Sequence, residues 1–278
     1  MMRGHAVMLA LAASILATPL AAQEMEPERC PRLVAWNGGA ELRPIPASYV
    51  IPVQAEATDD LVTLTFVGHS TFLIESPASV TIATDYNGVV RPSVVPRIAT
   101  MNRAHTTHYT LYPDPSIEYV LHGWGENGIP AEHELTVDDV WLRNVTTNIR
   151  GGFGMSGTIQ RDMNSMFVFE VAGLCILHLG HLHHELTDAH LKALSRIDVI
   201  LAPVDGGYTL NVDDMIGVLD AINAPLVIPM HYFNGTSLAR FLARLGETYA
   251  IERNATPTVE LSRSTLPPMR TVLVLPGF

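Results

Sequence analysis

Basic residues are scarce in this chain. It has 17 lysine and arginine residues against 28 acidic ones, a formal net charge of -11 at pH 7, and Lys192 as its one lysine. Surfaces that bind nucleic acid or anionic membranes need clustered Lys and Arg side chains, so this balance excludes both as the main partner. Charged residues make up only 16% and hydrophobic residues 47%, which excludes a disordered chain and favours a globular protein with a large core.

Cysteine is also rare. Cys30 and Cys175 are the two cysteines and form no CxxC pair, which excludes a zinc ribbon or a redox motif of that type. Cys175 lies in the apolar run GLCILHLG, which predicts a buried strand, and an inert core thiol is the simpler interpretation there. A disulfide between the two cysteines is the alternative, which an oxidising compartment would permit.

An apolar run of nearly membrane-spanning length occurs only at the start of the chain. Arg3 precedes the run VMLALAASILATPLAA, and the polar segment QEMEPE follows it. This order is typical of a secretory signal peptide over residues 1–23, cleaved near Ala22 or Gln23. A retained membrane anchor is the weaker interpretation, because the run is short and is interrupted by Pro19. We therefore expect a periplasmic or secreted protein with no membrane association after cleavage.

The rest of the chain has no internal repeat and no low-complexity tract. Residues 24–60 are rich in proline and turn formers, which predicts an irregular lead-in with a short strand near 48–53. Beyond it, short β-type segments recur, and after residue 185 buried strands alternate with amphipathic helices. The predicted strands lie at 61–68, 71–76, 79–85, 118–123, 134–147, 164–173, 174–180, 198–204, 226–230, 258–262 and 271–275, and the helices at 187–197, 212–223 and 237–246. We predict one α/β domain over 61–278, since no linker divides it.

Histidine is abundant, with twelve residues, and it is the commonest metal ligand among side chains. Eight of the twelve fall in four segments at predicted strand ends. These are His69 in FVGHSTFLIE, His105 and His108 in NRAHTTHYT, His178, His181, His183 and His184 in ILHLGHLHHELT, and His231 in VIPMHY. Side chains alternate between the faces of a strand, and a buried imidazole needs hydrogen-bond partners. We therefore expect at least one of these histidines to face a polar or metal-lined cavity.

These segments resemble the ordered landmarks of the metallo-β-lactamase superfamily, in particular its lactonase-like branch of zinc-dependent hydrolases. The pair VGHSTFLIES and TIATDYNG is similar to the opening strands of that branch, and NRAHTTHYT falls where its H-x-H-x-D-H metal motif belongs. HLGHLHHELT resembles the H-x-G-D segment, and VIPMHY resembles the late I-P-x-H strand end. The resemblance covers residues 61–231. It implies an α/β fold, the four-layer αβ/βα sandwich, with its metal site at one edge between two sheets.

The metal motif departs from the family pattern. Aligning the last two histidines of H-x-H-x-D-H with His105 and His108 places Arg103 at the first histidine and Thr107 at the aspartate. In the H-x-G-D segment, His181 takes the position of the bridging aspartate. A carboxylate between two dications offsets their repulsion, so its loss favours one ion over two.

The resemblance therefore implies a metal site made of imidazoles. The candidate ligands are His105, His108, His181 and His231, with His178 as a further candidate at its strand end. Zinc held by three histidines keeps an open position for water and lowers the pKa of that water to about 7. The resulting hydroxide could hydrolyse an ester, a lactone or an amide. Iron or copper would also accept this ligand set.

Two further residues are candidates for the catalytic chemistry. Asp205 follows a buried strand in APVDGGYTL, and it could either take a proton from metal-bound water or cap the next helix. By its position in the family pattern, His69 is expected near the site as a substrate contact or an orienting group. Asp85 is expected below the metal loop as a structural carboxylate or as a partner of a ligand.

The sequence thus favours an exported metal-dependent hydrolase that acts on a small ester-, lactone- or amide-like substrate. One alternative is a mononuclear iron or copper redox protein, or an oxygenase, on the same fold. Another is a family member that binds a ligand without catalysis. The expected partner of the hydrolase is a small molecule, and the sequence leaves the oligomeric state open.

Overall fold

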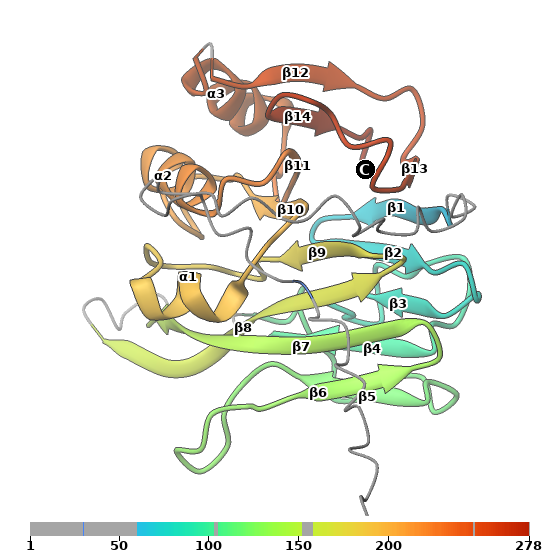
Figure 1. Ribbon diagram of the computed structural model, residues 1–278. Coiled ribbons are helices and arrows are strands. Elements are labelled where there is room, and N and C mark those ends of the chain that lie inside the picture. The colour runs from blue at the N-terminus through green and yellow to red at the C-terminus, as the bar shows by residue number, and fades with distance from the viewer. Residues whose placement is uncertain (1–29, 31–59, 103–104, 152–157, 247, 278) are drawn as a thin grey trace, which may run out of the picture.

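The computed structural model describes residues 30, 60–102, 105–151, 158–246 and 248–277. Within these ranges the chain forms two β-sheets and three helices (Figure 1). The predicted signal peptide and the strand near 48–53 lie outside the described residues, as does nearly all of the lead-in. None of the helices in the described ranges is long and apolar enough to cross a membrane.

The two sheets contain all the named strands of the described chain. The first sheet has the order β13 (Thr258–Leu261), β1 (Val62–Gly68), β2 (Thr71–Glu75), β3 (Thr81–Ala83), β4 (Ile98–Met101) and β5 (Tyr119–His122). The second has the order β12 (Ala250–Arg253), β14 (Thr271–Val274), β11 (Leu226–Met230), β10 (Val199–Pro203), β9 (Leu174–His178), β8 (Ile159–Val171), β7 (Val140–Arg150) and β6 (Glu134–Val137). The helices are α1 (Asp188–Leu194), α2 (Val212–Ile222) and α3 (Gly235–Arg244).

The central strands of the eight-stranded sheet are buried on both faces. In β10, Val199 and Leu201 belong to the core between the sheets, whereas Ile200 and Ala202 belong to the core beneath the helices. This division follows from the alternation of side chains along a strand. All three helices pack on that outer face (Figure 1). The layers formed by the described residues are therefore helix, sheet and sheet, and no described helix covers the outer face of the six-stranded sheet.

Helix α2 shows how the local sequence sets these elements. Val212, Met215 and Leu219 are buried at helical spacing, so one stripe of the helix faces the sheet. The side chain of Asn211 caps the first turn by accepting a hydrogen bond from a backbone N–H, and Asn223 ends the helix in the left-handed conformation. The predicted helix over 212–223 is confirmed.

Each predicted strand and helix over 61–278 corresponds to at least one element of the structure, with one change. The predicted strand over 134–147 is two antiparallel strands, β6 and β7, because the chain turns at Asp138, where φ is 49°. Two short strands were not predicted. β4 is a run of four buried residues and too short to show a period, and β12 is largely exposed beside β14.

The two cysteines form a disulfide, with Cα atoms 5.9 Å apart. The expectation of an inert thiol at Cys175 was therefore wrong, although its placement in a buried strand was right. Cys175 lies on the helix-facing side of β9, and Cys30 is buried in that same core. A separation of 145 residues gives no signal of such a contact in the sequence.

Candidate metal centre

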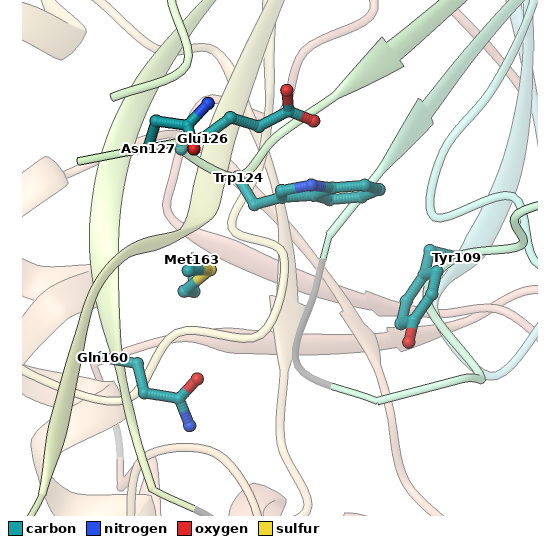
Figure 2. Close-up of a pocket in the computed structure, with 7 residues that line it drawn as sticks. Tyr109, Trp124, Glu126, Asn127, Gln160 and Met163 are labelled. Atoms are coloured by element: carbon teal, nitrogen blue, oxygen red, sulfur yellow. The ribbon is translucent and has the colours of Figure 1, made fainter. Parts of the chain in front are cut away.

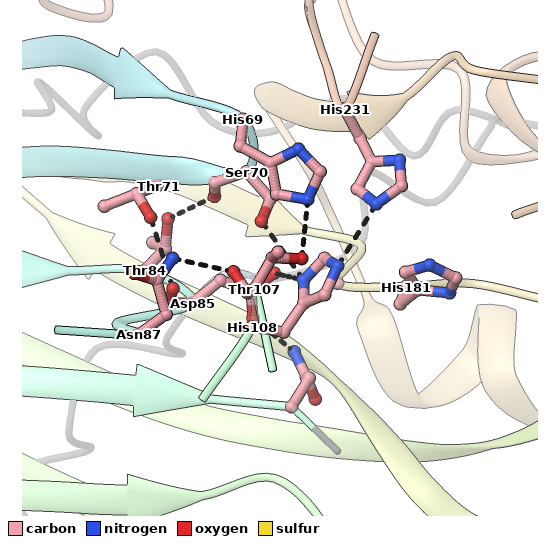
Figure 3. Close-up of polar contacts among 12 residues, drawn as sticks. His69, Ser70, Thr71, Thr84, Asp85, Asn87, Thr107, His108, His181 and His231 are labelled. Atoms are coloured by element: carbon pink, nitrogen blue, oxygen red, sulfur yellow. Dashed lines mark hydrogen bonds and ion pairs between the residues drawn. The ribbon is translucent and has the colours of Figure 1, made fainter. Parts of the chain in front are cut away.

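Four loops bring histidines to one edge of the two sheets (Figure 3). The turn between β1 and β2 carries His69, the loop after β4 carries His105 and His108, the segment after β9 carries His181, and β11 leads directly into His231. β9, β10 and β11 are parallel, so their carboxyl ends meet at the same edge. The backbone N–H of His231 donates to the carbonyl of His69 at 2.7 Å and thereby links the two sheets.

These five histidines form a compact group, here named the histidine cluster. One ring nitrogen from each of four of them lies within 4.8 Å of the others, the four being His69, His105, His108 and His231. The fifth, His181, has its Nε2 3.0 Å from Nε2 of His105. Its ring centre is 4.8 Å from those of His108 and His231. The structure thus brings together four of the five predicted ligands, together with His69.

The backbone at this site is strained. His69 and His231 both have a φ of 55°, in the left-handed region that costs a side chain of this kind of order 1 kcal/mol or more. The hydrogen bond between their backbones fixes both residues in this conformation. Strain of this kind is often stored where side chains must be aimed at a functional site, and here it aims two imidazoles toward the cluster (Figure 3).

Buried carboxylates orient two of the rings. Nδ1 of His108 lies 2.6 Å from a carboxylate oxygen of Asp85, and Nδ1 of His231 lies 3.0 Å from one of Asp205. Burial alone would raise the pKa of Asp85, but the His108 and His178 rings hold it well below its usual range. Burial would likewise raise the pKa of Asp205, and hydrogen bonds from His231 and Thr209 hold it below the usual range. Both carboxylates are therefore charged and accept the Nδ1–H of their histidine.

This orientation leaves two lone pairs facing each other. With the proton of each ring on Nδ1, the Nε2 atoms of His108 and His231 are both acceptors, yet they lie 3.1 Å apart. Two lone pairs at this distance repel unless a cation or a proton lies with them. Two histidine ligands of a tetrahedral zinc ion, at about 2.0–2.1 Å each, have nitrogens roughly 3.3 Å apart. The arrangement fits a metal centre.

Four rings of the histidine cluster are neutral at neutral pH. Burial, together with the neighbouring histidines, lowers the pKa of His105 to about 4 and that of His69 to about 3. Burial lowers the pKa of His181 well below its usual value, and it lowers that of His108 despite the opposing charge of Asp85. Neutral imidazole is the form that binds metal, so the rings of His105, His108 and His181 are in the form that a ligand requires.

Thr107 takes a position that the family pattern gives to an aspartate. Its hydroxyl lies 2.9 Å from Nε2 of His69 and 2.7 Å from Nδ1 of His105. The hydroxyl can donate to one ring and accept from the other, so it fixes the relative orientation of the two. The sequence marked Thr107 as the replacement of an aspartate but gave no sign of this contact. Arg103, the other replacement in that motif, lies outside the described residues.

The structure does not place His178 among the candidate ligands. Its ring is fully buried, with Nε2 donating to the carbonyl of Ser70 at 2.9 Å and Nδ1 accepting the N–H of Gly180 at 3.1 Å. One ring nitrogen thus holds the turn after β9 and the other holds the turn between β1 and β2. The two histidines differ because His178 belongs to β9 itself, whereas His181 belongs to the loop beyond it.

Asp205 orients His231 and does not cap the next helix, because Asn211 is the residue that caps α2. One carboxylate oxygen accepts from His231 and from the Thr209 hydroxyl at 2.6 Å, and the other accepts the backbone N–H groups of Gly207, Tyr208 and Thr209. Five donors fill its acceptor positions. Asp205 therefore fixes His231 and the loop before α2, and neither oxygen is free to take a proton from water.

Sequence reasoning missed two asparagines that support the cluster. Asn102 donates to Asp85 at 2.9 Å, and Asn164 accepts the backbone N–H of His181 at 2.7 Å. The Nε2 atom of His183 lies 2.5 Å from Nδ1 of His181 and orients that ring. The available signal was an asparagine next to an apolar strand, which by itself does not indicate a site. The tertiary structure alone shows which ring each residue holds.

Two cavities adjoin this edge and share Tyr109. One, of about 660 Å³, is lined by His69 and Thr107 together with mostly apolar side chains. The other, of about 510 Å³, is lined by Trp124, Glu126, Gln160 and Met163 among others, and no member of the histidine cluster lines it (Figure 2). The first cavity is therefore the one that opens onto the cluster.

Comparison with known proteins places the fold and the site in a family. A family model described as the beta-lactamase superfamily domain matches residues 63–231, which is more than half of the sequence. The chain belongs to the beta-lactamase superfamily. This membership agrees with the resemblance found in the sequence, and the match ends at His231 of the cluster.

Individual relatives share most of the chain. It is 26% identical over 219 residues to a UPF0173 metal-dependent hydrolase of Methanoculleus marisnigri, covering 71% of this chain and 92% of the relative. Among solved structures it is similar to a Thermotoga maritima protein described as a candidate Zn-dependent hydrolase of the metallo-beta-lactamase superfamily. That match has a TM-score of 0.55 and 29% identity, and it covers 77% of this chain and 98% of the other. The predicted α/β sandwich of metallo-β-lactamase type is confirmed, but the described residues form three of its four predicted layers, because no described helix covers the six-stranded sheet.

Proposed function

We propose that the chain is a metal-dependent hydrolase whose histidine cluster holds one zinc ion and directs activated water at an ester, a lactone or an amide. The observation that carries the proposal is the pair of Nε2 atoms of His108 and His231, 3.1 Å apart with their Nδ1–H groups committed to buried carboxylates. The relatives support it, since the Methanoculleus protein is named a metal-dependent hydrolase and the Thermotoga protein is described as Zn-dependent.

The proposed ligands are the four predicted histidines that the structure brings together. They are His105, His108, His181 and His231. When bound, zinc lowers the pKa of a water molecule and polarises a carbonyl group. The protein's own contribution is to hold the rings neutral and correctly turned. Asp85 does this for His108 and Asp205 for His231.

The carboxylates argue for one ion. Each oxygen of Asp85 already accepts a hydrogen bond, one from Asn102 and one from His108, and both oxygens of Asp205 are engaged. Among the described residues of the cluster and its supports, no carboxylate oxygen is therefore left to bridge two cations. The two buried negative charges match the charge of one dication, which supports a mononuclear centre.

We assign His69 to substrate contact. Its ring centre lies 4.2 Å from that of His231, and the residue also lines the 660 Å³ cavity. Through the Thr107 hydroxyl it is coupled to His105. A group at the boundary between metal ligands and cavity can donate to or accept from a bound carbonyl compound, which is the role proposed for it.

The proposed location is outside the cytoplasm. The Cys30–Cys175 disulfide supports this, because disulfides persist in the periplasm and outside cells, whereas the cytosol keeps thiols reduced. The layout of residues 1–23 supports it independently as a secretory signal. N-terminal sequencing of the mature protein from a periplasmic or culture fraction tests this, and an intact N-terminus in the cytosolic fraction would contradict it.

Elemental analysis of protein purified without a metal-chelating tag tests the central proposal. We expect about one zinc per chain and hydrolysis of p-nitrophenyl acetate, in which water adds to the acyl carbon, the acyl C–O bond breaks and acetic acid and p-nitrophenol leave. His108→Ala and His231→Ala should lose both metal and activity. His190→Gln is the matched control, because glutamine preserves the capping box of α1 away from the cluster.

The other results of this experiment are equally informative. Iron or copper with an optical or EPR signal would replace the hydrolase by a redox protein or oxygenase, which an all-imidazole ligand set also accommodates. Metal-free protein whose hydrolysis is unchanged by both alanine substitutions would exclude the proposed site.

A further inference from the structure

The 660 Å³ cavity beside the histidine cluster has mostly apolar walls. Val89, Val90, Leu111, Tyr112 and Phe233 line it, and its volume lies in the range typical of sites for small ligands, roughly 300–1,000 Å³. The cluster residue His69 lines it as well, so the cavity leads directly to the proposed reaction centre.

Hydrogen bonds from Asn87 hold one wall of the cavity in place, and they engage the polar atoms of its side chain. The side chain of Asn87 donates to the carbonyl of Thr107 at 2.8 Å and accepts the backbone N–H groups of Val89 and Val90 at 2.8 and 2.9 Å. This ties the loop after β3 to the loop that carries the ligands. The amide of Asn87 is engaged in this way, and the wall it supports presents two valines.

Aromatic rings continue the apolar wall outward from the cluster. The ring of Phe233 lies 5.5 Å from that of His69 and 5.2 Å from that of His231. The ring of Tyr208 lies 5.3 Å from that of Phe233. An apolar group bound here would therefore touch both the wall and the ligand-bearing strand end.

Several of these apolar side chains are unusually open to solvent. Val89 is 87% exposed, Leu111 62%, Tyr112 89% and Phe233 55%. Apolar side chains gathered in this way around one cavity are a mark of a binding site, because an apolar occupant would remove them from water. None of the described residues lining the cavity is a lysine, arginine, aspartate or glutamate. An anionic substrate would find no charged partner there among these residues.

We propose that this cavity holds an uncharged alkyl or acyl chain of medium length, with the scissile carbonyl at His69 and Thr107. This assignment of the substrate class rests on the proposed hydrolase function. It distinguishes the protein from a hydrolase of substrates whose chain carries a phosphate or a carboxylate, for which none of the described residues lining the cavity supplies a lysine or an arginine.

The first test compares p-nitrophenyl acetate, butyrate and octanoate on the zinc-loaded protein. We expect kcat/KM to rise by roughly threefold for each added methylene until the cavity is filled, as apolar burial predicts. The ratio of kcat/KM for p-nitrophenyl octanoate to kcat/KM for p-nitrophenyl acetate should fall by about tenfold in Leu111→Asn and in Val89→Asn. Met269→Asn is the control, because Met269 is similarly exposed at 64% and does not line the cavity. Its ratio should equal that of the parent.

The second test needs no metal and so separates the two proposals. Calorimetry on metal-free protein should detect octanamide but not acetamide, and Leu111→Asn should weaken octanamide binding. Octanamide binding without hydrolysis of any ester would keep the cavity assignment and overturn the proposed function. Hydrolysis of p-nitrophenyl acetate would support the proposed function. If kcat/KM then did not depend on acyl chain length and octanamide did not bind, the cavity assignment alone would be overturned. The cavity assignment would also be overturned if the protein hydrolysed bis-p-nitrophenyl phosphate faster than the carboxylic esters. It would likewise be overturned if the protein bound phosphatidylcholine vesicles but not octanamide.

Discussion

At the scale of single residues, two buried aspartates orient the histidines of the proposed metal centre. Asp85 has no exposed surface and Asp205 has 5%, yet both are held as carboxylates by the hydrogen bonds they accept. Each fixes the proton of one imidazole on Nδ1 and so frees its Nε2 for a metal ion. The carboxylates of Asp85 and Asp205 thus supply the negative charge of the site, although neither would touch the ion.

Asp85→Asn tests this role. The amide keeps the shape of the side chain but removes the charge that polarises His108, so we expect zinc affinity to fall by about 10- to 100-fold. Competition with a chromogenic chelator measures the affinity, and circular dichroism confirms that the variant is folded. Asp60→Asn, at an exposed position, serves as the control. Unchanged affinity in Asp85→Asn would show that the carboxylate does not support the ligand.

At the scale of elements, the turn after β9 decides where His181 lies. Gly180 has a φ of 61°, and a Cβ atom there would lie 2.4 Å from Oδ1 of Asn164 and 2.6 Å from Nδ2 of Asn102. Only glycine lets the turn approach these two side chains. Because Asn164 also accepts the N–H of His181, close packing of the turn sets the position of a proposed ligand.

Gly180→Ala should therefore damage both the fold and the metal site. We expect the free energy of unfolding to fall by more than the roughly 1 kcal/mol that left-handed strain alone costs, and zinc affinity to fall with it. Gly128→Ala is the matched control, since Gly128 has a φ of 79° and a Cβ atom added there would meet nothing within 4 Å. Urea denaturation and chelator competition give the two quantities. Equal effects of both substitutions would refute the packing argument.

At the scale of the whole molecule, a few long-range links join parts of the chain that are far apart in sequence. The backbone hydrogen bond between His69 and His231 joins the two sheets at the edge that carries the histidine cluster. The Cys30–Cys175 disulfide joins Cys30 to the central strand β9 on the face that the helices cover. The first link positions the proposed ligand His231 and the proposed substrate contact His69, and the second stabilises the core under the helices.

Removing the disulfide should lower stability without changing the metal site. Cys30→Ser combined with Cys175→Ser should reduce the free energy of unfolding by about 2–4 kcal/mol, since the bridge spans a long loop. Urea denaturation of the double variant and of the parent, each with and without a phosphine reductant, measures this. The reductant should shift only the parent. Coincident midpoints for all four samples would mean that the bridge contributes nothing.

Much of the fold could be predicted from local sequence. β1 alternates between buried and half-buried residues, α2 carries an apolar stripe between two asparagine caps, and the parallel strands are continuous apolar runs. These signals act over a few residues, so they survive without knowledge of the rest of the chain. The short strands β4 and β12 were missed because their formation depends on neighbours distant in the sequence.

The sequence by itself determined most of the strands, the helices and the histidine-bearing segments, because each of these depends on the residue types of one short stretch. Only the tertiary structure decided which histidines meet. It separated His178 from His181, which are three residues apart, by placing one inside a strand and the other beyond a tight turn. It also paired Cys30 with Cys175 and gave Asp205 to His231. Such choices depend on contacts between segments that are far apart in the chain, which no local pattern encodes.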